Sequence, residues 1–177
     1  MSLKNLWPKK DAPQIEKALQ FIEKYKDKKI VLKYGGQVMA NDQLSKAFAQ
    51  DAAICNQVGI KNLVIHGGGP QIKKRLEEQN IQSKFILGLR VTDEKVIKIV
   101  EDVLLNDINP DLVRSINSFN VVAEPVTARN GKGILKVTKA KNPDLGFVAD
   151  PEEIDVNKLN DIITVSYTHL RAHETHE

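Results

Sequence analysis

The sequence predicts an α/β protein with a mainly parallel sheet, and three observations support this class. Two short apolar runs, residues 30–32 and 63–65, each lead into a glycine-rich stretch, and each stretch precedes a segment with helical spacing. The two units start about 30 residues apart, which is the length of one strand–helix–strand repeat. Parallel strands connected in this way have their following loops on one edge of the sheet, so we expect the two glycine stretches to meet there.

Length and composition limit the class of protein. The chain has 177 residues, enough for one domain with a core, and its 41% apolar and 28% charged residues are typical of a soluble globular protein. The net charge of +3, without a basic run that would form a face, argues against a nucleic-acid partner. The single cysteine, Cys55, excludes an internal disulfide and a cysteine-based metal cluster. No apolar run approaches the roughly 18 residues of a membrane span and no signal peptide is recognisable, so we expect a cytoplasmic protein without a membrane partner.

Apolar spacing predicts these elements in the first half of the chain: a helix over 14–25, a strand over 30–34, a helix over 41–58, a strand over 63–66 and a helix from Pro70. The helix over 14–25 is amphipathic and precedes the first strand. Its apolar face can pack on its own domain or on another subunit, and the sequence favours neither.

The second half is expected to begin with extended structure over 84–91, broken by Gly88, and then a helix capped by Thr92. A further helix is expected to start at residues 109–111, and short strands are expected over 121–123, 147–148 and 162–165. The dipeptide Asn130-Gly131 is the strongest hairpin signal in the chain and predicts a turn that joins 126–129 to 133–137.

Lys33 ends the first apolar strand and is followed closely by Gly35 and Gly36. A lysine is rarely buried without a partner, but at a strand end beside a glycine loop it can reach a phosphate as a point charge. The two glycines would let backbone N–H groups approach the same phosphate without a Cβ clash. The alternative is an ordinary tight turn that carries a surface lysine.

The second stretch has three glycines in a row, Gly67, Gly68 and Gly69. A plain turn needs one or two, so three indicate a ligand that lies on the backbone at the start of the next helix, where the helix dipole favours a carboxylate or a phosphate. The stretch has neither the P-loop spacing nor the dinucleotide-binding spacing. His66, which precedes it, is interpreted as a hydrogen-bonded structural residue rather than a base.

Arg90 lies in the extended segment just before the expected helix cap. An arginine can hold a carboxylate through two parallel hydrogen bonds. The alternative is a salt bridge on the helix side, with Asp93 or Glu94. Together, Lys33, two glycine cradles and Arg90 form the pattern expected for transfer of a phosphoryl group from a nucleotide to a small acid, where positioning and charge neutralisation supply most of the catalysis.

Residues 166–177 do not match the pattern that precedes them, and three of the four histidines fall there. A histidine-rich tract can bind metal, but these histidines follow an expected strand at a point where a turn and a helix should come. The segment resembles translated sequencing adapter, so we interpret it as an artefactual tail and expect no metal site.

Four motifs together resemble acetylglutamate kinases, of the amino-acid kinase family, in their order and spacing: residues 33–36, 66–70, 88–92 and 144–148. The resemblance covers residues 29–165. It implies a three-layer αβα sandwich with a mainly parallel central sheet. It also implies the reaction of ATP with N-acetyl-L-glutamate to give N-acetylglutamyl 5-phosphate, a step of arginine biosynthesis.

The resemblance further implies roles for individual residues. Lys33 would be the catalytic residue that stabilises charge on the transferring γ-phosphoryl group, and it would bind ATP phosphates together with Gly35 and Gly36. Gly67, Gly68 and Gly69 would hold N-acetyl-L-glutamate. Arg90 would bind the α-carboxylate of that substrate from a hairpin lid, and Mg²⁺ would arrive with ATP rather than in a protein site.

Family members that are inhibited by arginine carry a helix before the first strand, and this helix links dimers into a hexameric ring. The helix over 14–25 therefore implies a homo-oligomer, a dimer or a hexamer, and inhibition by L-arginine in the full-length protein.

Family members are much longer than this chain. Their C-terminal half supplies the nucleotide pocket and further ligands to both substrates, none of which can be located here. We expect an N-terminal extension over 1–28, an acetylglutamate-binding N-terminal kinase domain over 29–165 and the tail over 166–177. The chain is then a truncated kinase with little or no activity alone. The alternatives are a non-catalytic module that binds acetylglutamate or arginine, an oligomerisation fragment, or another amino-acid kinase such as aspartokinase, glutamate 5-kinase, carbamate kinase or uridylate kinase.

Overall fold

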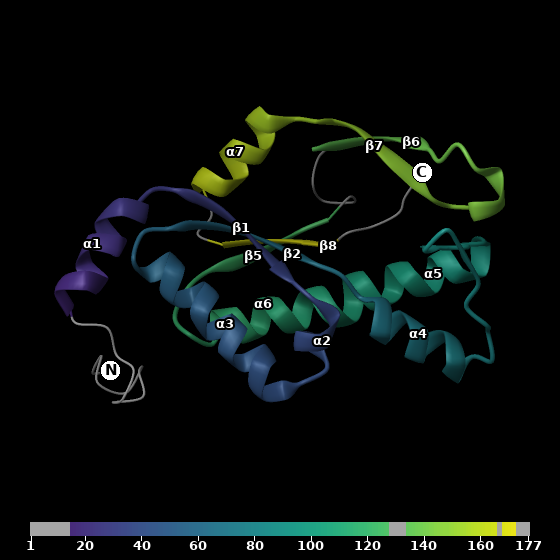
Figure 1. Ribbon diagram of the computed structural model, residues 1–177, viewed down its shortest axis with the longest axis horizontal. Coiled ribbons are helices and arrows are strands. Elements are labelled where there is room, and N and C mark those ends of the chain that lie inside the picture. The colour runs from purple at the N-terminus through teal and green to yellow at the C-terminus, as the bar shows by residue number, and fades with distance from the viewer. Residues whose placement is uncertain (1–14, 128–133, 166–167, 173–177) are drawn as a thin grey trace.

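A central parallel sheet lies between two layers of other elements (Figure 1). The structure, a computed structural model, describes residues 15–127, 134–165 and 168–172. Helices α3 (Asp42–Gln57) and α6 (Asn109–Asn117) cover one face of the sheet, and α7 (Val156–Val165) lies over the other. This arrangement confirms the expected three-layer α/β fold.

The first half of the chain has α1 (Ile15–Tyr25), β1 (Lys29–Tyr34), α2 (Gly36–Met39), α3, β2 (Lys61–His66), α4 (Gly69–Glu78), β3 (Phe85–Ile86) and β4 (Leu89–Arg90). The second half has α5 (Glu94–Asp102), the π-helical turn η2 (Val103–Ile108), α6, β5 (Ala123–Val126), β6 (Leu135–Lys139), the 3₁₀ turn η3 (Pro143–Leu145), β7 (Ala149–Ile154), α7 and β8 (Thr168–Ala172). No helix among these described ranges is long and apolar enough to cross a bilayer.

The main sheet has the strand order β1-β2-β8-β5, and all its neighbouring strands are parallel. Strands β1 and β2 are in register to their ends, with Tyr34 opposite His66. The Gly67 N–H continues the ladder by donating to the Tyr34 carbonyl oxygen at 3.4 Å. The loops that follow the two strands therefore start side by side, as the parallel arrangement predicts.

Two apolar clusters hold the layers together. In the first, α3 turns small buried residues (Ala49, Ala52 and Ala53) toward the sheet, so the helix lies close to it. In the second, α4 packs against the helix formed by α5 and η2 through Ile72, Leu76, Val96, Ile99, Val100, Val103, Leu104 and Ile108. The second cluster fixes the position of α4, which directly follows Gly67 and Gly68 and begins with Gly69.

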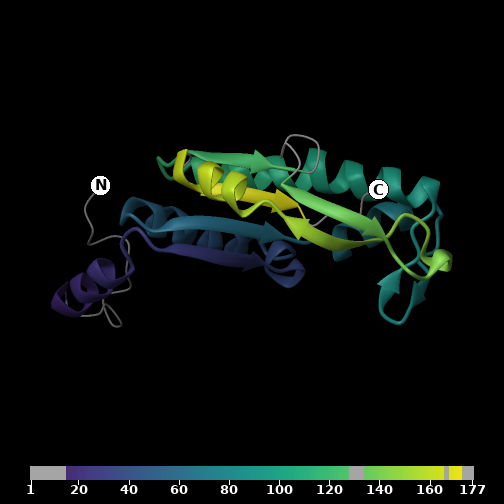
Figure 2. The ribbon, with the colours of Figure 1, turned by 90° about the horizontal axis from the view of Figure 1, so that it is seen from above.

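Helices α5 and α6 form one continuous helix through η2, where the sequence predicted two (Figure 2). The sequence predicts a helix start at residues 109–111, and proline, here Pro110, is common in the first turn of a helix. Inside an α-helix its ring meets the carbonyl group four residues earlier and its missing N–H removes one hydrogen bond. The wider π turn just before it accommodates both, so the chain continues instead of breaking.

Three predictions for the C-terminal part are wrong. The apolar run over 162–165 ends helix α7 and is not a strand, and residues 147–148 precede strand β7. The turn expected at Asn130-Gly131 lies outside the described residues, but the strands on either side do not form a hairpin. Strand β5 pairs in parallel with β8, whereas β6 pairs antiparallel with β7. The local turn signal could not show which edges were available for pairing.

Strand β8 belongs to the segment that the sequence sets apart as a tail, and it lies between β2 and β5. The boundary at 165/166 stays a prediction.

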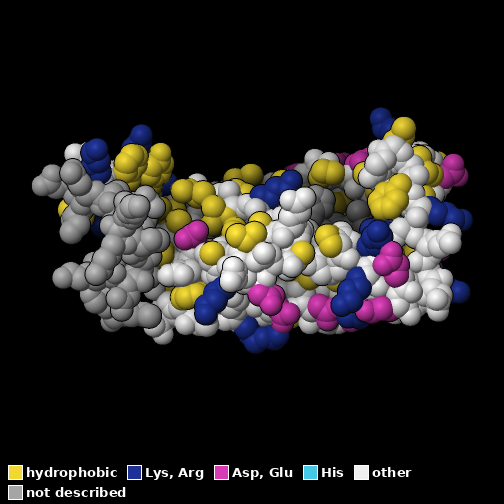
Figure 3. All heavy atoms as spheres, turned by 60° about the horizontal axis from the view of Figure 1, so that its bottom comes forward, with side chains coloured by type: hydrophobic (Ala, Val, Ile, Leu, Met, Phe, Trp, Pro, Cys, Tyr) yellow, Lys and Arg dark blue, Asp and Glu magenta, His cyan; other side chains and the backbone are white. Residues whose placement is uncertain are grey.

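At the other end of the chain, α1 leaves Leu19 and Phe21 exposed, and Figure 3 shows apolar side chains gathered at the end of the molecule where α1 lies.

Candidate functional site

The two glycine loops touch each other. A Cβ atom added to Gly36 would lie 2.8 Å from Cδ of Pro70, so a residue with a side chain would collide with the start of α4. The loop after β1 and the loop after β2 thus form one edge of the molecule.

A small cavity of about 150 Å³ opens beside the second loop. Its lining comes from four separate parts of the chain: Gly68, Ile72, Leu89, Arg90, Thr92, Val100, Leu104 and Val148. The structure therefore brings Gly68 and Arg90, two of the residues expected from the sequence, to the same cavity. Gly67 and Gly69 flank Gly68 in the turn, whereas Lys33, Gly35 and Gly36 are not part of this lining.

A short hairpin, β3 and β4, carries Arg90 to the cavity. Its turn has positive φ at Leu87 (50°) and Gly88 (82°), the combination found in tight hairpin turns. The Arg90 guanidinium donates to the hydroxyl oxygen of Ser83 and lies 4.8 Å from the ring centroid of Phe85. These neutral contacts orient the cation without neutralising it.

No carboxylate among the described residues pairs with Arg90. Asp93 caps α5 by accepting from the N–H groups of Lys95 and Val96, both at 2.9 Å. Glu94 pairs with Lys98 at 3.1 Å. The helix-side salt bridge considered from the sequence is therefore not formed. Partial burial lowers the pKa of Arg90 from its usual value, and the cation, without a carboxylate partner among the described residues, lines the cavity.

Thr92 does not cap α5, contrary to the prediction. Its hydroxyl donates back to the Arg90 carbonyl oxygen at 3.0 Å, and the next residue provides the cap. Its backbone instead binds the segment before β7: Thr92 N–H donates to the Leu145 carbonyl oxygen at 2.8 Å, and its carbonyl oxygen accepts from Phe147 N–H at 2.7 Å. Gly146, between them, has φ 74°, and a Cβ there would lie 2.2 Å from the Thr92 oxygen. This contact places Val148 at the cavity. The sequence analysis includes Val148 in the motif over 144–148 but assigns it no role.

The turn between β2 and α4 presents free backbone donors. Gly68 is pressed against the π-helical turn, because an added Cβ would lie 2.7 Å from Cδ2 of Leu104 and 2.8 Å from Cδ1 of Ile108. At Gly67 and Gly69 an added Cβ would meet nothing within 4 Å. No described residue accepts a hydrogen bond from the N–H of Gly68 or Gly69. Both donors lie at the positive end of a ten-residue helix, where an anion is stabilised.

His66 lies beneath this turn and is fully buried, as is Asn109. Nδ1 of His66 is 3.1 Å from the Gly67 carbonyl oxygen, and Nε2 is 3.4 Å from the Asn109 amide nitrogen. Burial lowers the pKa of His66, so the ring is neutral near pH 7. The structure agrees with the interpretation of His66 as a hydrogen-bonded structural residue. Asn109 was missed because its place before Pro110 indicated a helix start.

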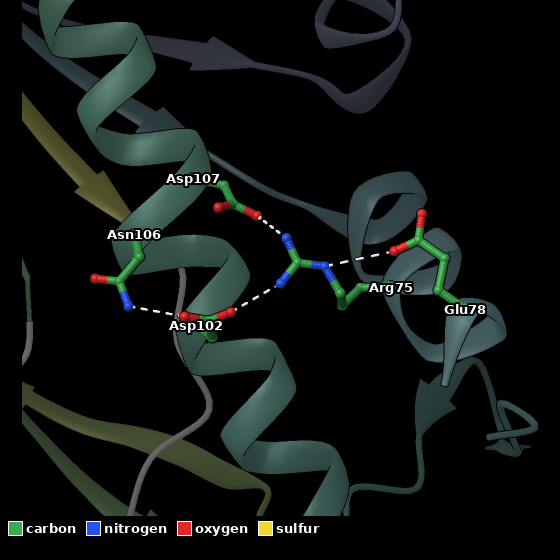
Figure 4. A network of polar contacts seen from close by, with 5 residues as sticks. All are labelled: Arg75, Glu78, Asp102, Asn106 and Asp107. Atoms are coloured by element: carbon green, nitrogen blue, oxygen red, sulfur yellow. Dashed lines mark hydrogen bonds and ion pairs between the residues drawn. The ribbon is translucent and has the colours of Figure 1, made fainter. Parts of the chain in front are cut away.

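Arg75 links α4 to the continuous helix formed by α5, η2 and α6 (Figure 4). Its two terminal nitrogens lie 2.9 Å from a carboxylate oxygen of Asp102 and 2.6 Å from one of Asp107. In an α-helix, side chains five residues apart point about 140° away from each other. The π turn between Asp102 and Asp107 brings both carboxylates to the same side, within reach of one guanidinium.

Lys33 lies on the opposite face of the sheet from α3. Along β1 the side chains alternate, and Tyr34 is buried on the α3 side, where its ring stacks on Phe48. Lys33 and Val31 point the other way, and Val31 is 61% exposed. Within the described part of the chain, Lys33 has no hydrogen-bond or ion-pair partner.

A wider cleft of about 610 Å³ lies between the end of α4 and the hairpin, lined by Lys73, Glu77, Asn80, Ile81, Gln82, Ser83 and Phe85. Its lysine already pairs with its glutamate, at 3.7 Å. The lining includes neither a glycine of the two loops nor Arg90. We therefore place the candidate site at the smaller cavity.

Comparison with known proteins shows the family of this chain. The model of the family described as "Amino acid kinase family" matches residues 28–168. The acetylglutamate kinase of Pelagibacter ubique is 40% identical over 159 residues, which are 90% of this chain and 54% of that protein. The acetylglutamate kinase of Brucella anthropi is 40% identical over 164 residues, 86% of this chain and 55% of the relative. The chain thus spans about half the length of the curated relatives it matches.

Solved structures share the fold. The structure of smu.665 from Streptococcus mutans UA159 has a TM-score of 0.73 at 24% identity, covering 81% of this chain and 58% of that one. The structure of N-acetylglutamate synthase from Neisseria gonorrhoeae, complexed with coenzyme A and N-acetyl-glutamate, has a TM-score of 0.72 at 17% identity and covers 89% of this chain and 36% of that one. At these identities the likeness supports the fold alone. With the curated relatives, it confirms the family resemblance carried by the sequence motifs.

Proposed function

Because the chain belongs to the amino acid kinase family, we propose that it forms the acid-binding part of an acetylglutamate kinase. One observation carries the proposal: Gly68 and the unneutralised Arg90 line one small cavity. A cation and free backbone donors around a single hollow suit a ligand with two separate anionic groups.

N-acetyl-L-glutamate is such a ligand. Arg90 would hold the α-carboxylate through two parallel hydrogen bonds. The N–H groups of Gly68 and Gly69, with Gly67 shaping the turn, would receive the γ-carboxylate at the N-terminus of α4. The cavity of about 150 Å³ is smaller than the roughly 300–1,000 Å³ of sites for drug-sized ligands, which favours a small acid over a nucleotide here.

The phosphoryl donor would lie across the first glycine loop. Gly35 and Gly36 would present backbone N–H groups to ATP, and Lys33 would stabilise charge on the transferring γ-phosphoryl group. The γ-carboxylate is already ionised near pH 7, so its attack on phosphorus needs no general base. The products are N-acetylglutamyl 5-phosphate and ADP, and Mg²⁺ would be bound through the phosphates of ATP. The remaining parts of the nucleotide site would come from outside this chain, which would then bind the acid and turn it over slowly or not at all.

Other expectations belong to the whole protein. The exposed apolar face of α1 would contact another subunit in a dimer or hexamer, and L-arginine would inhibit that assembly. The whole protein would be located in the cytoplasm and would act in arginine biosynthesis.

Isothermal titration calorimetry tests the acid site directly. The chain is expected to bind N-acetyl-L-glutamate and to bind N-acetyl-L-glutamine, which lacks the γ-carboxylate, much more weakly. Loss of a charge-assisted hydrogen-bond pair is worth about 1.5–3 kcal/mol, so Arg90→Gln should weaken acid binding roughly 10- to 100-fold. Arg114→Gln is the matched control, since Arg114 is exposed and its one ion-pair partner among the residues that the structure describes is Asp111, on its own helix.

Equal affinities of the Arg90→Gln and Arg114→Gln variants would contradict the proposal. Binding of L-arginine in place of the acid would instead favour a sensor module, which is compatible with a chain that spans half of its relatives. Binding of aspartate, glutamate or carbamate would favour another branch of the family.

A further inference from the structure

The residues proposed to bind the acid do not explain what orients the free N–H of Gly68. A peptide group is planar and trans, so the carbonyl of one residue and the N–H of the next point in opposite directions. The orientation of the Gly68 N–H is therefore set by whatever holds the Gly67 carbonyl. That partner is Nδ1 of His66, at 3.1 Å.

A carbonyl oxygen only accepts, so Nδ1 of His66 must carry the proton in this contact. In the neutral ring Nε2 is then an acceptor, and the Asn109 amide nitrogen at 3.4 Å is the donor that faces it. The opposite orientation of the amide would set the Asn109 oxygen against the lone pair of Nε2. Oδ1 of Asn109 is instead buried without a partner among the described residues. Asn109 thus favours the tautomer that His66 needs to bind Gly67.

The π-helical turn brings Asn109 to this position. Leu104 and Asn109 are five residues apart, which is about 140° around a regular α-helix. Both nevertheless face the turn between β2 and α4: Leu104 packs against Gly68, and Asn109 reaches His66. The wider turn between them is what allows one helix to support the glycine backbone and the histidine beneath it.

We propose that His66 and Asn109 are positioning residues for the carboxylate-binding turn. Asn109 holds the Nδ1–H tautomer of His66, the ring draws the Gly67 carbonyl inward, and the Gly68 N–H is turned away from the ring and left free for the anion. The acid-binding part of this inference depends on the proposed function, whereas the hydrogen-bond relay from Asn109 through His66 to the Gly67 carbonyl does not.

A matched pair of variants at position 66 tests the relay. The amide nitrogen of asparagine lies close to where Nδ1 of histidine lies. The amide group of glutamine reaches the position of Nε2, where its oxygen can accept from the Asn109 amide. His66→Asn can therefore still donate to Gly67, whereas His66→Gln keeps the contact with Asn109 and loses Gly67. Calorimetry should show His66→Gln binding N-acetyl-L-glutamate about tenfold more weakly than His66→Asn.

Thermal unfolding of both variants separates positioning from mere burial. If His66 only fills space, affinity falls in step with melting temperature and the tenfold difference between the variants is absent. Equal affinities, or weaker binding by His66→Asn, overturn the proposal.

Nitrogen NMR of the unliganded chain tests the relay without any acid. The resonances of His66 are identified by their loss in the His66→Gln spectrum, and they should show a protonated Nδ1 and an unprotonated Nε2 near pH 7. The Gly68 amide resonance should shift in Asn109→Leu, which cannot donate to the ring. A protonated Nε2 with a bare Nδ1 refutes the relay, whatever the chain binds. The expected tautomer in a chain that does not bind the acid counts against the proposed function alone.

Discussion

Replacing Gly146 with alanine tests whether the segment before β7 holds Thr92, and through it Arg90, at the cavity. Gly146 has φ 74°, and an added Cβ would lie 2.2 Å from the carbonyl oxygen of Thr92 and 2.9 Å from its carbonyl carbon. Both atoms belong to backbone, which cannot rotate aside as the end of a side chain can. The segment must therefore move away from Thr92.

Two costs add in this variant. A positive φ costs alanine about 1–2 kcal/mol. Movement of the segment breaks two backbone hydrogen bonds, from Thr92 N–H to the Leu145 carbonyl oxygen and from Phe147 N–H to the Thr92 carbonyl oxygen. Each is worth about 0.5–1.5 kcal/mol, with more lost when the buried groups stay unpaired. We expect Gly146→Ala to lower the free energy of unfolding by about 3–5 kcal/mol, which is a large share of the stability of a domain.

Gly88→Ala is the control, because Gly88 has φ 82° but an added Cβ would meet no atom within 4 Å. Only the dihedral cost applies, about 1–2 kcal/mol. Urea unfolding followed by circular dichroism and by fluorescence measures both variants, with coincident transitions as the check of two-state behaviour. Losses of equal size at the two glycines would refute the argument from the Thr92 contact.

Two further predictions concern charge. Arg75→Met leaves Asp102 and Asp107 without their shared cation, and because all three groups are partly exposed, the free energy of unfolding should fall by only about 1 kcal/mol. The control Lys73→Met breaks an exposed pair and should cost less than about 0.5 kcal/mol. Equal losses of the two variants in urea unfolding would contradict a stabilising contact of Arg75 with both carboxylates. His66 should make folding sensitive to acid, because burial lowers its pKa from the usual 6.5. As the pH falls below about 6.5, the unfolded chain binds a proton that the folded chain does not, so stability falls. His66→Asn should remove this part of the slope in unfolding free energy against pH, and an unchanged slope would show that His66 is not its source.

The sequence predicts the first sheet units well because their signals are local. An apolar run, a glycine turn and an amphipathic helix follow one another in β1 and in β2, and parallel pairing then requires their loops to meet. The contact between Gly36 and Pro70 is the result. The extended segment that carries Arg90 was also visible, because Gly88 marks its turn.

The contacts that hold the site in place could not be predicted from the sequence, because they join residues far apart in the chain. Arg75 pairs with Asp102 and Asp107 across 27 and 32 residues, and His66 meets Asn109 across 43. Each of these contacts also depends on the π turn. Its only local sign is Pro110, which has the same appearance at the start of a new helix.

The run over 162–165 was ambiguous for a different reason. Short apolar runs are common to buried strands and buried helices, and periodicity cannot separate them. Here Ile163 is buried in helix α7, so tertiary packing decided between the two. The hairpin signal at residues 130–131 failed in the same way, because a turn dipeptide does not specify which strands pair.

The glycines of this chain need two different explanations, and the distinction bears on the proposed site. Packing alone accounts for Gly36 against Pro70, for Gly68 against Leu104 and for Gly146 against Thr92. Packing demands nothing at Gly35, Gly67 or Gly69, where an added Cβ would meet no atom within 4 Å and φ is not positive. Glycine carries an entropic cost at such positions, so these three residues, rather than the triple glycine as a whole, are the part of the sequence that indicates a ligand close to the backbone.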